Sequence, residues 1–470
     1  MAQMIPLEDY VARVLEAIVP LASTRVALGE AHGRILAEDV SAVVPVPPWT
    51  NSAMDGYAVR AAETSGASAQ APVVLPVAGD VPAGAAPTPL APGSAQRIMT
   101  GAMLPEGADA VVKVEDTDQA PGPHPLPERV EIRAAAREGL NVRRAGENVR
   151  AGDSVMAAGT RLSAAAVSAL ASVGLGSVPV AARARVAVVS TGAELCDAGE
   201  SLAPGTIPDS NGLLLAGLVS EHGADCVSVA RSGDSAEELA TVLRRAAAGA
   251  DLIVTSGGVS AGAFDPLTML AHADQREGAP VRLDFVKVAM QPGKPQGHGW
   301  MRADDGRRVP IICLPGNPVS VLVSFTTIVA PALARLADVD SCLPDLPGRP
   351  TLTARAAAAW LTPPGRRQHV PVRFTEPPTE LVAGSVTGAD AGDRIGAPSG
   401  PDAAPGTGAS WVTPTHRLGS GSHLVASLPA AQALAVVAAE VESVEVGDEL
   451  PLIPLTGSCP SGRPVRVDAP

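Results

Sequence analysis

The spacing of apolar side chains predicts helices in three segments of the first 180 residues. Apolar residues recur at intervals of three or four in residues 7–19, 27–40 and 163–173, which is the period of a helix with one buried face. We therefore predict an extended helical N-terminal domain made of residues 1–46 and 146–180. In it, the third helix should pack back on the first two.

A β-rich stretch begins where the helical pattern stops, at Pro45, Pro47 and Pro48. Short valine-rich runs then alternate with Gly and Pro, as in short strands joined by turns. We predict that residues 47–145 form a β domain inserted between the helical pieces. Within it, residues 117–128 contain four prolines and should form a long exposed loop.

Strands and helices alternate between residues 185 and 336. The expected strands are 185–190, 226–229, 251–255, 283–288 and 310–314, and the expected helices are 211–222, 236–248 and a long one from Pro318. This alternation predicts a three-layer α/β domain with a mainly parallel sheet over residues 181–338. The uncharged run of residues 318–334 contains Ser, Thr and Pro, so we expect a buried helix rather than a membrane span.

A linker with three prolines at residues 341–350 separates this domain from a second β-rich region. We predict a β-barrel-like C-terminal domain over residues 350–470. The predicted fold class is therefore multidomain, α/β plus β.

The composition argues against several kinds of partner. The formal net charge is −14, whereas nucleic acid and anionic membranes attract cationic surfaces. The five cysteines form no CxxC pair, so no zinc or redox motif is indicated and a reducing compartment fits. The first residues lack the basic and apolar regions of a signal peptide. We expect a cytoplasmic protein.

Three predicted strand ends in the α/β region carry Gly-rich, polar sequences, at residues 190–194, 255–262 and 314–318. Ligands bind beyond the carboxyl ends of the strands in open α/β sheets, and glycine lets the backbone approach a phosphate closely. For each segment alone, a tight turn or a helix cap is as good an explanation as a binding site. Glu194 and Asp265 alone are explained by solvated surface acids. Together the segments favour one composite anion pocket.

Two further features carry candidate chemistry. Asp55 follows a proline stop and lies among Asn, Ser and Gly, which indicates an acid presented on a loop. Lysine is rare, because only Lys113, Lys287 and Lys294 occur among 35 basic residues. Two of the three lie in one short segment, where they are either fixed cations for an anion or ordinary surface charge.

The segment Asn51–Tyr57 resembles the signature of the molybdopterin molybdenumtransferases, the MoeA/gephyrin family. Other segments resemble further motifs of that family, in the family's order, over about residues 7–336: Arg97–Ala102, Gly146–Asn148, Ser190–Leu195, Pro208–Asn211, Thr255–Ser260, Met290–Pro295 and Leu314–Ser320. Beyond residue 336 the resemblance is thinner, with Gly365–Arg366 and Gly421–His423 as the best matches.

The resemblance implies both a fold and a reaction. It implies four domains, of which the α/β domain is MogA-like, and a homodimer with its active site between the α/β domain of one subunit and the β insert of the other. It implies a Mg²⁺-dependent transferase that takes adenylylated molybdopterin and molybdate, releases AMP and inserts molybdenum into the dithiolene. The expected partners are these small molecules, with transient contacts to the molybdopterin adenylyltransferase and to recipient molybdoenzymes.

The resemblance also implies roles for matching residues. Asp55 and Thr100 would face the reacting molybdenum or phosphate, and Glu194 would orient molybdate or water. Asp265 would be catalytic and would hold Mg²⁺ with Asp234, although a cap of the following helix is the favoured explanation of Asp234. Acidic walls alone would repel anionic substrates, so a divalent cation is needed between them. The residues expected to bind pterin and phosphate are Ser190, Thr191, Gly192, Ser210, Asn211, Ser256, Gly257, Gly258, Ser260, Lys287, Lys294, Pro315, Gly316, Asn317, Pro318, Arg366 and Ser422.

Three positions depart from the family pattern. Gln291 stands where the family often has a lysine, Asn148 replaces a common acid, and Ala193 replaces a common Asp. None is an expected catalytic residue, so we expect activity to survive. The missing cation at residue 291 is expected to weaken anion affinity or to shift substrate preference.

Two other functions stay open. One is a catalytically silent pterin-binding scaffold, which the three departures suggest. The other is a molybdopterin adenylyltransferase, whose single domain resembles residues 185–336, although the β insert that carries Asp55 argues against it. A nicotinamide dehydrogenase is disfavoured, because no GxGxxG follows the first α/β strand.

Overall fold

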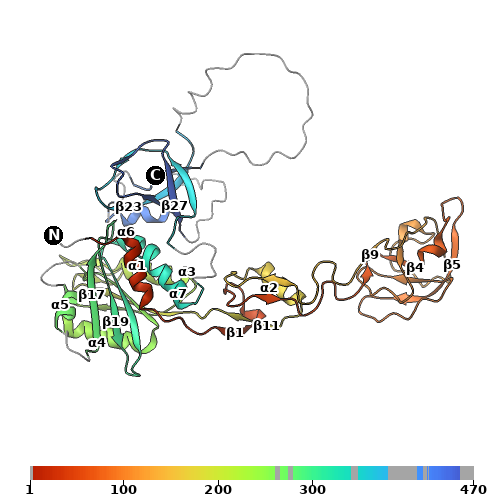
Figure 1. The fold of residues 1–470 in the computed structure, drawn as a ribbon, viewed down its shortest axis with the longest axis horizontal. Helices are drawn as coiled ribbons and strands as arrows, with labels where there is room; N and C mark the ends of the chain where they lie inside the picture. The colour runs from red at the N-terminus through yellow and green to blue at the C-terminus, as the bar shows by residue number, and fades with distance from the viewer. Residues whose placement is uncertain are drawn as a thin grey trace, which may run out of the picture. The chain divides into compact units, whose positions relative to one another are not determined.

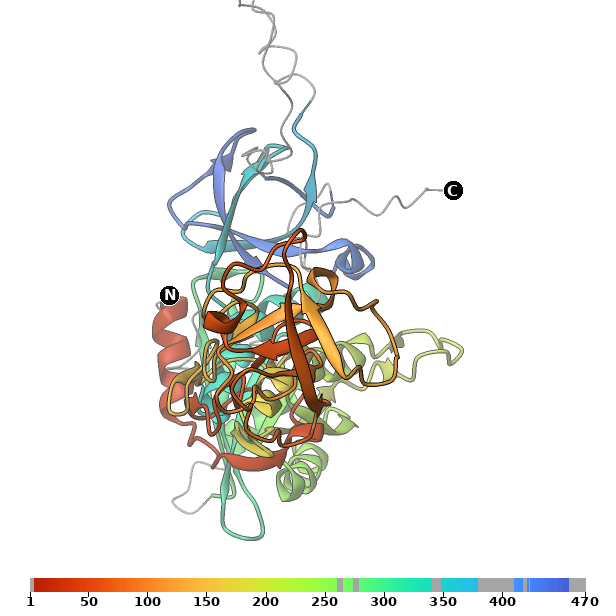
Figure 2. The same ribbon diagram turned by 90° about the vertical axis from the view of Figure 1, so that its right-hand side faces the viewer.

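The computed structural model describes residues 4–259, 265–273, 279–339, 348–378, 410–416, 421 and 423–455. The chain forms two compact units. The N-terminal unit is residues 25–180, and the larger unit is residues 1–24 with 181–470. Figures 1 and 2 show the elements of each unit. The finer division into four domains stays a prediction.

The β insert contains a five-stranded sheet in the order β7-β4-β6-β5-β8. Successive side chains of β4 point to opposite faces, so Tyr57 and Val59 enter one buried core and Ala58 enters another. The β structure predicted for this region is confirmed. Its elements are β3 Asn51–Ser52, β4 Gly56–Val59, η2 Ala61–Thr64, β5 Val73–Val81, β6 Ala95–Ile98, β7 Ala110–Lys113, η3 Val114–Asp116, β8 Arg129–Ile132 and β9 Val142–Arg143.

The helix predicted over residues 27–40 is wrong. This segment contains one short 3-10 turn, η1 Leu28–Glu30, and otherwise pairs with distant strands. Leu36 forms a bridge with Val180 and is fully buried in a core shared with Leu170. Gly33 has φ +76°, which ends helical backbone. The apolar side chains of this segment are therefore buried in a core, but they project from extended backbone rather than from a helix.

The remaining elements beside this core pair in two short ladders. They are β1 Thr24–Ala27 with β11 Ser177–Val180 and β2 Val40–Ser41 with β10 Ser154–Met156. The helix α2 Ala164–Ser172 was predicted. Ser163 caps its N-terminus, because the Ser163 hydroxyl accepts a hydrogen bond from the Ala166 amide at 3.1 Å. The N-terminal domain is thus less helical than predicted.

The larger unit is built on a six-stranded sheet in the order β15-β12-β16-β20-β19-β17. The first four strands run parallel, and β19 and β17 are antiparallel to their neighbours. The predicted mainly parallel α/β domain is confirmed. Its strands are β12 Arg185–Thr191, β15 Asp225–Ser232, β16 Leu252–Ser256, β17 Val281–Lys287, β19 Pro295–Arg302 and β20 Arg308–Leu314, with β13 Leu195–Cys196 and β14 Ile207–Pro208 pairing apart.

Helices cover both faces of this sheet (Figure 1). Val186 and Val188 of β12 pack in one core with α1, α3 and α7, while Ala187 and Val189 pack in another with α4 and α5. The helices are α1 Leu7–Glu16, α3 Ser210–Glu221, α4 Ala236–Gly249, α5 Pro266–Ala273, α6 Pro318–Ser324, the π turn η4 Phe325–Val329 and α7 Ala330–Leu336. All the predicted α/β elements are present, and α5 and β19 are additions.

The continuous helical run from Pro318 to Leu336 is the one helix in the described part of the chain with the length and composition to cross a membrane. However, 94% of its most apolar window is buried inside the protein. It forms the centre of the core that α1 and α3 complete. A buried core helix was predicted, and the packing confirms it.

The C-terminal region forms a closed five-stranded barrel, as predicted. Its strands pair in the order β23-β24-β21-β27-β25, and β25 pairs back on β23 to close the circle. Figure 2 shows these strands, cyan to blue, curving around a common core. The elements are β18 Met290–Gln291, β21 Leu352–Ala356, β22 Trp360–Leu361, β23 Arg367–Thr375, β24 Trp411–Pro414, η5 Val425–Ala430, β25 Ala433–Val437, β26 Ser443–Val444 and β27 Glu449–Pro454.

Acidification should destabilise the barrel through His369 of β23. This side chain is 1% exposed, and burial lowers its pKa from 6.5 to about 4. Between these values the unfolded chain binds a proton that the folded chain does not, so stability falls as the pH falls through this window. We expect a loss of about 2 kcal/mol at pH 5 and about 3 kcal/mol at pH 4, relative to pH 7.

Urea unfolding at pH 7, 5 and 4 measures this dependence. His369→Gln should flatten the curve by the stated amounts, whereas His32→Gln, a change at an exposed histidine, should leave it as in the wild type. Equal pH dependence in the wild type and His369→Gln would contradict the assignment.

Candidate functional site

Asp55 emerges at the start of β4, the strand that lies between β6 and β7. The next residue, Gly56, pairs with Ile98 on one side and Lys113 on the other. A Cβ at residue 56 would lie 2.0 Å from the Val112 carbonyl oxygen. Only glycine allows so close an approach. Asp55, the residue before it, is exposed at the start of the strand.

The Asp55 carboxylate is held in a fixed orientation by Thr100. The backbone amide and the hydroxyl of Thr100 donate to the same oxygen, Oδ1, at 2.6 and 2.8 Å. Thr100 lies in the turn after β6, where Gly101 has φ +80° and donates its amide to the Ser52 carbonyl oxygen at 2.8 Å. The two family-like segments, Asn51–Tyr57 and Arg97–Ala102, are therefore in direct contact in the fold.

A cavity of about 640 Å³ opens beside this pair, and we call it the Asp55 cavity. Met54, Tyr57 and Met99 supply apolar walls, while Glu115 adds a second carboxylate. The remaining lining residues are Asp55, Gly56, Arg97, Thr100, Val114, Gln119, Ala120, Pro121, Gly122, Pro123 and His124. The proline-rich loop predicted as merely exposed thus forms one wall.

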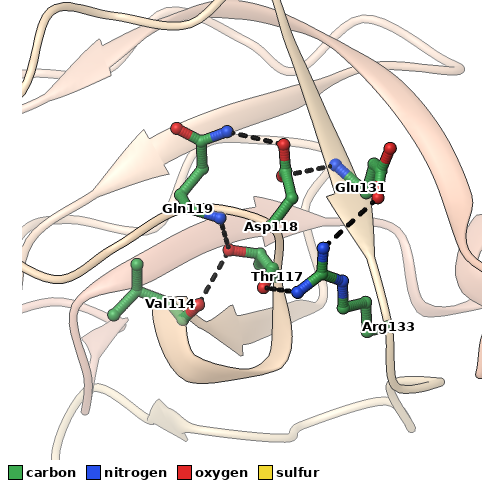
Figure 3. Close-up of polar contacts among 6 residues, drawn as sticks. All are labelled: Val114, Thr117, Asp118, Gln119, Glu131 and Arg133. Carbon is green, nitrogen blue, oxygen red and sulfur yellow. Dashed lines mark hydrogen bonds and ion pairs between the residues drawn. The ribbon is translucent and has the colours of Figure 1, made fainter. Parts of the chain in front are cut away.

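The loop is anchored at its beginning by a network of hydrogen bonds (Figure 3). The Thr117 hydroxyl donates to the Val114 carbonyl oxygen at 2.7 Å and accepts from the Gln119 amide at 3.0 Å. Asp118 accepts from the Glu131 amide at 2.8 Å, and Arg133 donates to the Thr117 carbonyl oxygen at 3.1 Å. The loop therefore leaves the sheet in a fixed direction.

Arg97 secures the far end of the loop. Its guanidinium donates to Asp80 at 2.7 Å and to the His124 carbonyl oxygen at 2.9 Å. Because Asp80 offsets its charge, Arg97 serves to hold the wall rather than to bind an anion. With Asp55 and Glu115 in the lining, the Asp55 cavity is acidic.

A second cavity of about 430 Å³ lies in the larger unit, at the carboxyl ends of three parallel strands. We call it the glycine cavity. Every one of the three predicted strand ends contributes to it. Among the expected site residues, those that line it are Thr191, Glu194, Ser210, Asn211, Ser256, Gly257, Gly258, Pro315, Gly316, Asn317 and Pro318.

Two successive glycines make the floor of this cavity. Gly257 and Gly258 have φ +88° and +69°, a conformation that costs little only for glycine. A Cβ at either position would come within 3.0 Å of Thr191 atoms. The side-chain amide of Asn211 donates through Nδ2 to the Gly316 carbonyl oxygen at 2.6 Å. This bond joins α3 to the turn before α6.

The acidic residues differ in their placement. Glu194 is exposed and lines the cavity. Asp265 is 6% exposed, and a Cβ on Gly258 would lie 3.2 Å from its Oδ1, so this carboxylate borders the glycine floor. Asp234 accepts a hydrogen bond from the Ala193 amide at 3.1 Å. The alternative of Asp234 as a helix cap is wrong, because Ser235 caps α4.

The described residues contain no group of three or more His, Cys, Asp or Glu that could hold a metal by itself. Mg²⁺ commonly uses one or two carboxylates together with substrate phosphates and water. The Asp265 carboxylate beside a glycine floor fits that pattern. Asp234 fits it less well, since one of its oxygens is engaged by the Ala193 amide.

Several expected residues do not line the cavity. Ser190 is buried and accepts from the Ser256 hydroxyl at 3.4 Å, so it supports the floor. Lys287, Lys294 and Arg366 lie outside the lining but in the same unit. Gly192 is next to the lining residue Thr191. Ser260 and Ser422 fall outside the described residues.

The cavity wall also contains Pro208, Asp209 and Pro295, which were not predicted from the sequence. The signal was present, because Pro208 and Asp209 stand inside a segment recognised as family-like and Pro295 follows Lys294. Asp209 also accepts from the Gly212 amide at 2.9 Å and so caps α3. Leu195, Ile207 and Val259 complete the lining.

Two family models match this chain, and several known proteins are similar to it. Residues 5–174 match the model of the MoeA N-terminal region, domains I and II, and residues 187–335 match a probable molybdopterin binding domain. The chain is similar to molybdopterin molybdenumtransferase 2 of Mycobacterium tuberculosis, with 45% identity over 77% of this chain and 85% of the relative. It is also similar to the molybdopterin molybdenumtransferase of Nostoc, with 39% identity over 66% of this chain and 68% of the relative.

Among solved structures, the fold is similar to that of the molybdopterin biosynthesis MoeA protein from Pyrococcus horikoshii. The TM-score is 0.73 with 29% sequence identity, and the match covers 96% of this chain and 99% of the other.

Proposed function

We propose, from the premise that this chain belongs to the molybdopterin molybdenumtransferase family, that it converts adenylylated molybdopterin and molybdate into molybdenum cofactor and AMP. Family membership itself makes the chain a transferase of molybdenum cofactor biosynthesis, with molybdopterin and molybdate as substrates. The adenylylated form of the substrate, the release of AMP and the roles of single residues are the proposal.

The observation that carries the proposal is the glycine floor at residues 257–258. It lies where three parallel strands end, and no side chain at these positions blocks an oxyanion. Ser256 and Asn317 add neutral polar groups to the lining. Such a surface suits a phosphate or molybdate oxygen that must approach the backbone closely.

The charge of the glycine cavity requires a cation beside the substrate. Glu194 and Asp209 line it, and Asp265 borders its floor. We propose that Asp265 binds Mg²⁺ together with substrate phosphate. Bound Mg²⁺ would offset the negative charge of the phosphate that leaves as AMP.

Glu194 and Asp55 are proposed to act on the reacting oxygens. Glu194 would orient the molybdate or water oxygen that approaches the phosphorus. Asp55, fixed by Thr100, would face the reacting molybdate or phosphate and accept a proton from a water molecule that reacts there. Both side chains are exposed, so substrate can reach them.

The assembly is likewise a proposal. The family resemblance favours a homodimer in which the α/β domain of one subunit and the β insert of the other share a substrate. It also favours transient contacts with the adenylyltransferase that supplies the substrate and with the molybdoenzymes that receive the product. The cytoplasmic location stays a prediction.

The purified chain, given adenylylated molybdopterin, molybdate and Mg²⁺, should release AMP and form molybdenum cofactor. Chelation of Mg²⁺ should slow AMP release by about tenfold or more, since an uncompensated phosphate charge raises the barrier. AMP is quantified by chromatography.

Two outcomes would replace the proposal. No AMP above background, with pterin binding retained, would indicate a scaffold. Consumption of ATP with molybdopterin that lacks adenylate would indicate an adenylyltransferase. The second alternative is the weaker one, because the β insert with its fixed Asp55–Thr100 pair has no part in it.

A further inference from the structure

The guanidinium of Arg366 is held by the side chain of Gln291. Arg366 Nη1 donates to Gln291 Oε1 at 2.6 Å, and both residues are half-buried. Arg366 immediately precedes β23 of the barrel, and Gln291 belongs to β18. These strands pair in parallel, and the Arg367 amide donates to the Ala289 carbonyl oxygen at 3.0 Å. The pair therefore sits on a fixed backbone.

Gln291 lies on a turn that leads directly into the wall of the glycine cavity. The Val288 amide donates to the Lys294 carbonyl oxygen at 2.8 Å and closes the turn. The Gln296 amide group donates to the Gly293 carbonyl oxygen and to the Ser324 hydroxyl, both at 2.7 Å, so the turn is fastened to α6. Pro295, at the end of the turn, lines the cavity.

Steric contact adds to the rigidity of this turn. Gly293 has φ +104°, and a Cβ there would lie 2.9 Å from the Ser324 hydroxyl oxygen. The turn consequently has little freedom to move relative to the cavity wall. Arg366, which binds Gln291, is therefore also held in a fixed position relative to the cavity wall.

The chemistry of the pair preserves the charge of Arg366. An amide oxygen accepts a hydrogen bond from the guanidinium but carries no net charge. A carboxylate at residue 291 would hold Arg366 more strongly and would cancel its charge. A lysine there would repel it. The lining of the glycine cavity includes Glu194 and Asp209 but neither lysine nor arginine, so a full positive charge bound to the turn that leads into its wall has a use.

We propose that Gln291 is a positioning residue that holds Arg366, fully charged, for the anionic substrate. The family resemblance implies a missing cation at residue 291, whereas the structure assigns Gln291 the task of orienting another cation, Arg366. This inference rests on the proposed function, because the anion in question is the phosphate or molybdate of that reaction.

Substitutions that separate orientation from charge test the proposal. Gln291→Glu should keep Arg366 in place, so the melting temperature should stay equal or rise. AMP binding, measured by titration calorimetry, should nevertheless weaken about tenfold, with a raised KM for adenylylated molybdopterin and a nearly unchanged kcat. Gln291→Met, which removes the acceptor without adding charge, should weaken binding less, by about threefold.

Arg366→Ala should weaken AMP binding about tenfold, and adding Gln291→Met to it should weaken binding no further, because the guanidinium that Gln291 holds is gone. Gln70→Glu adds the same negative charge as Gln291→Glu, but at an exposed site of the N-terminal unit. It is the control and should bind AMP like the wild type.

Two results would overturn the inference: wild-type AMP affinity in Gln291→Glu, or a further threefold loss when Gln291→Met is added to Arg366→Ala. Failure of the proposed function would look different. In that case the wild type would release no AMP from adenylylated molybdopterin, whatever the affinities of the variants for AMP.

Discussion

Asp55→Asn should lower kcat for AMP release by about a thousandfold. The substitution keeps the size of the side chain and removes its charge and its capacity to accept a proton. The two Thr100 donors reach a single oxygen, at 2.6 and 2.8 Å, and an amide oxygen can still accept them. The loss should therefore appear in the chemical step and leave the position of the side chain unchanged.

The fold should not suffer from this change. Asp55 is exposed at the start of β4, so its replacement buries no unsatisfied group, and the melting temperature should match that of the wild type. The measurement pairs AMP release with pterin binding, which should persist. Glu138→Gln, another exposed acid of the N-terminal unit that lies outside the Asp55 cavity lining, is the control and should keep the wild-type rate. A rate above one tenth of wild type for Asp55→Asn would remove Asp55 from catalysis.

The glycine cavity was predictable because its residues follow from a rule of topology. Once residues 185–190, 251–255 and 310–314 are recognised as parallel strands, their carboxyl ends must lie along one edge. The short polar sequences at those ends then fall together without any knowledge of side-chain packing. Lys287 also ends a strand that runs parallel to β20, because β17 and β20 are both antiparallel to β19. It falls outside the lining because β17 is the last strand of the sheet, two positions away from β20.

The failures come from contacts between residues distant in the chain. The apolar spacing of residues 27–40 has a helical period, but Leu36 fills a core with Leu162 and Leu170, and long-range burial overrides local pattern. The strand β19 was missed because Pro295, Gly297 and Gly299 interrupt any strand-like run. At residue 299 a Cβ would lie 1.8 Å from the Arg282 carbonyl oxygen, so close packing of two strands selects glycine there.

The loop wall of the Asp55 cavity could not be predicted for a related reason. Four prolines mark residues 117–128 as irregular, but their direction depends on Arg97 and Arg133, which reach the loop from β6 and from the end of β8. A pattern of single residues carries no information on such contacts. The pairing of Gln291 with Arg366 is equally invisible in sequence, since the barrel and the α/β sheet are joined only in the folded chain.

Gly257→Ala should both destabilise the larger unit and abolish tight anion binding. At φ +88° an L-residue is strained, and the added Cβ would lie 2.6 Å from the Thr191 carbonyl oxygen and 2.9 Å from its hydroxyl. The first of these is a backbone atom of β12 that cannot rotate away. We expect a loss of about 3 kcal/mol in unfolding free energy and a displacement of the floor that weakens AMP binding about a hundredfold.

Gly306→Ala separates the two effects. Gly306 has φ +86°, nearly the same backbone conformation, but a Cβ there meets nothing within 4 Å, and the residue lies in the turn between β19 and β20, outside the cavity lining. It should cost only the backbone strain, about 1 kcal/mol, and leave AMP affinity unchanged. Urea unfolding and titration calorimetry on both variants, at a temperature where each is folded by circular dichroism, give the comparison. If Gly257→Ala bound AMP as tightly as Gly306→Ala, the glycine floor would not be the anion site, and the reaction assigned to this chain would need another place for its phosphate.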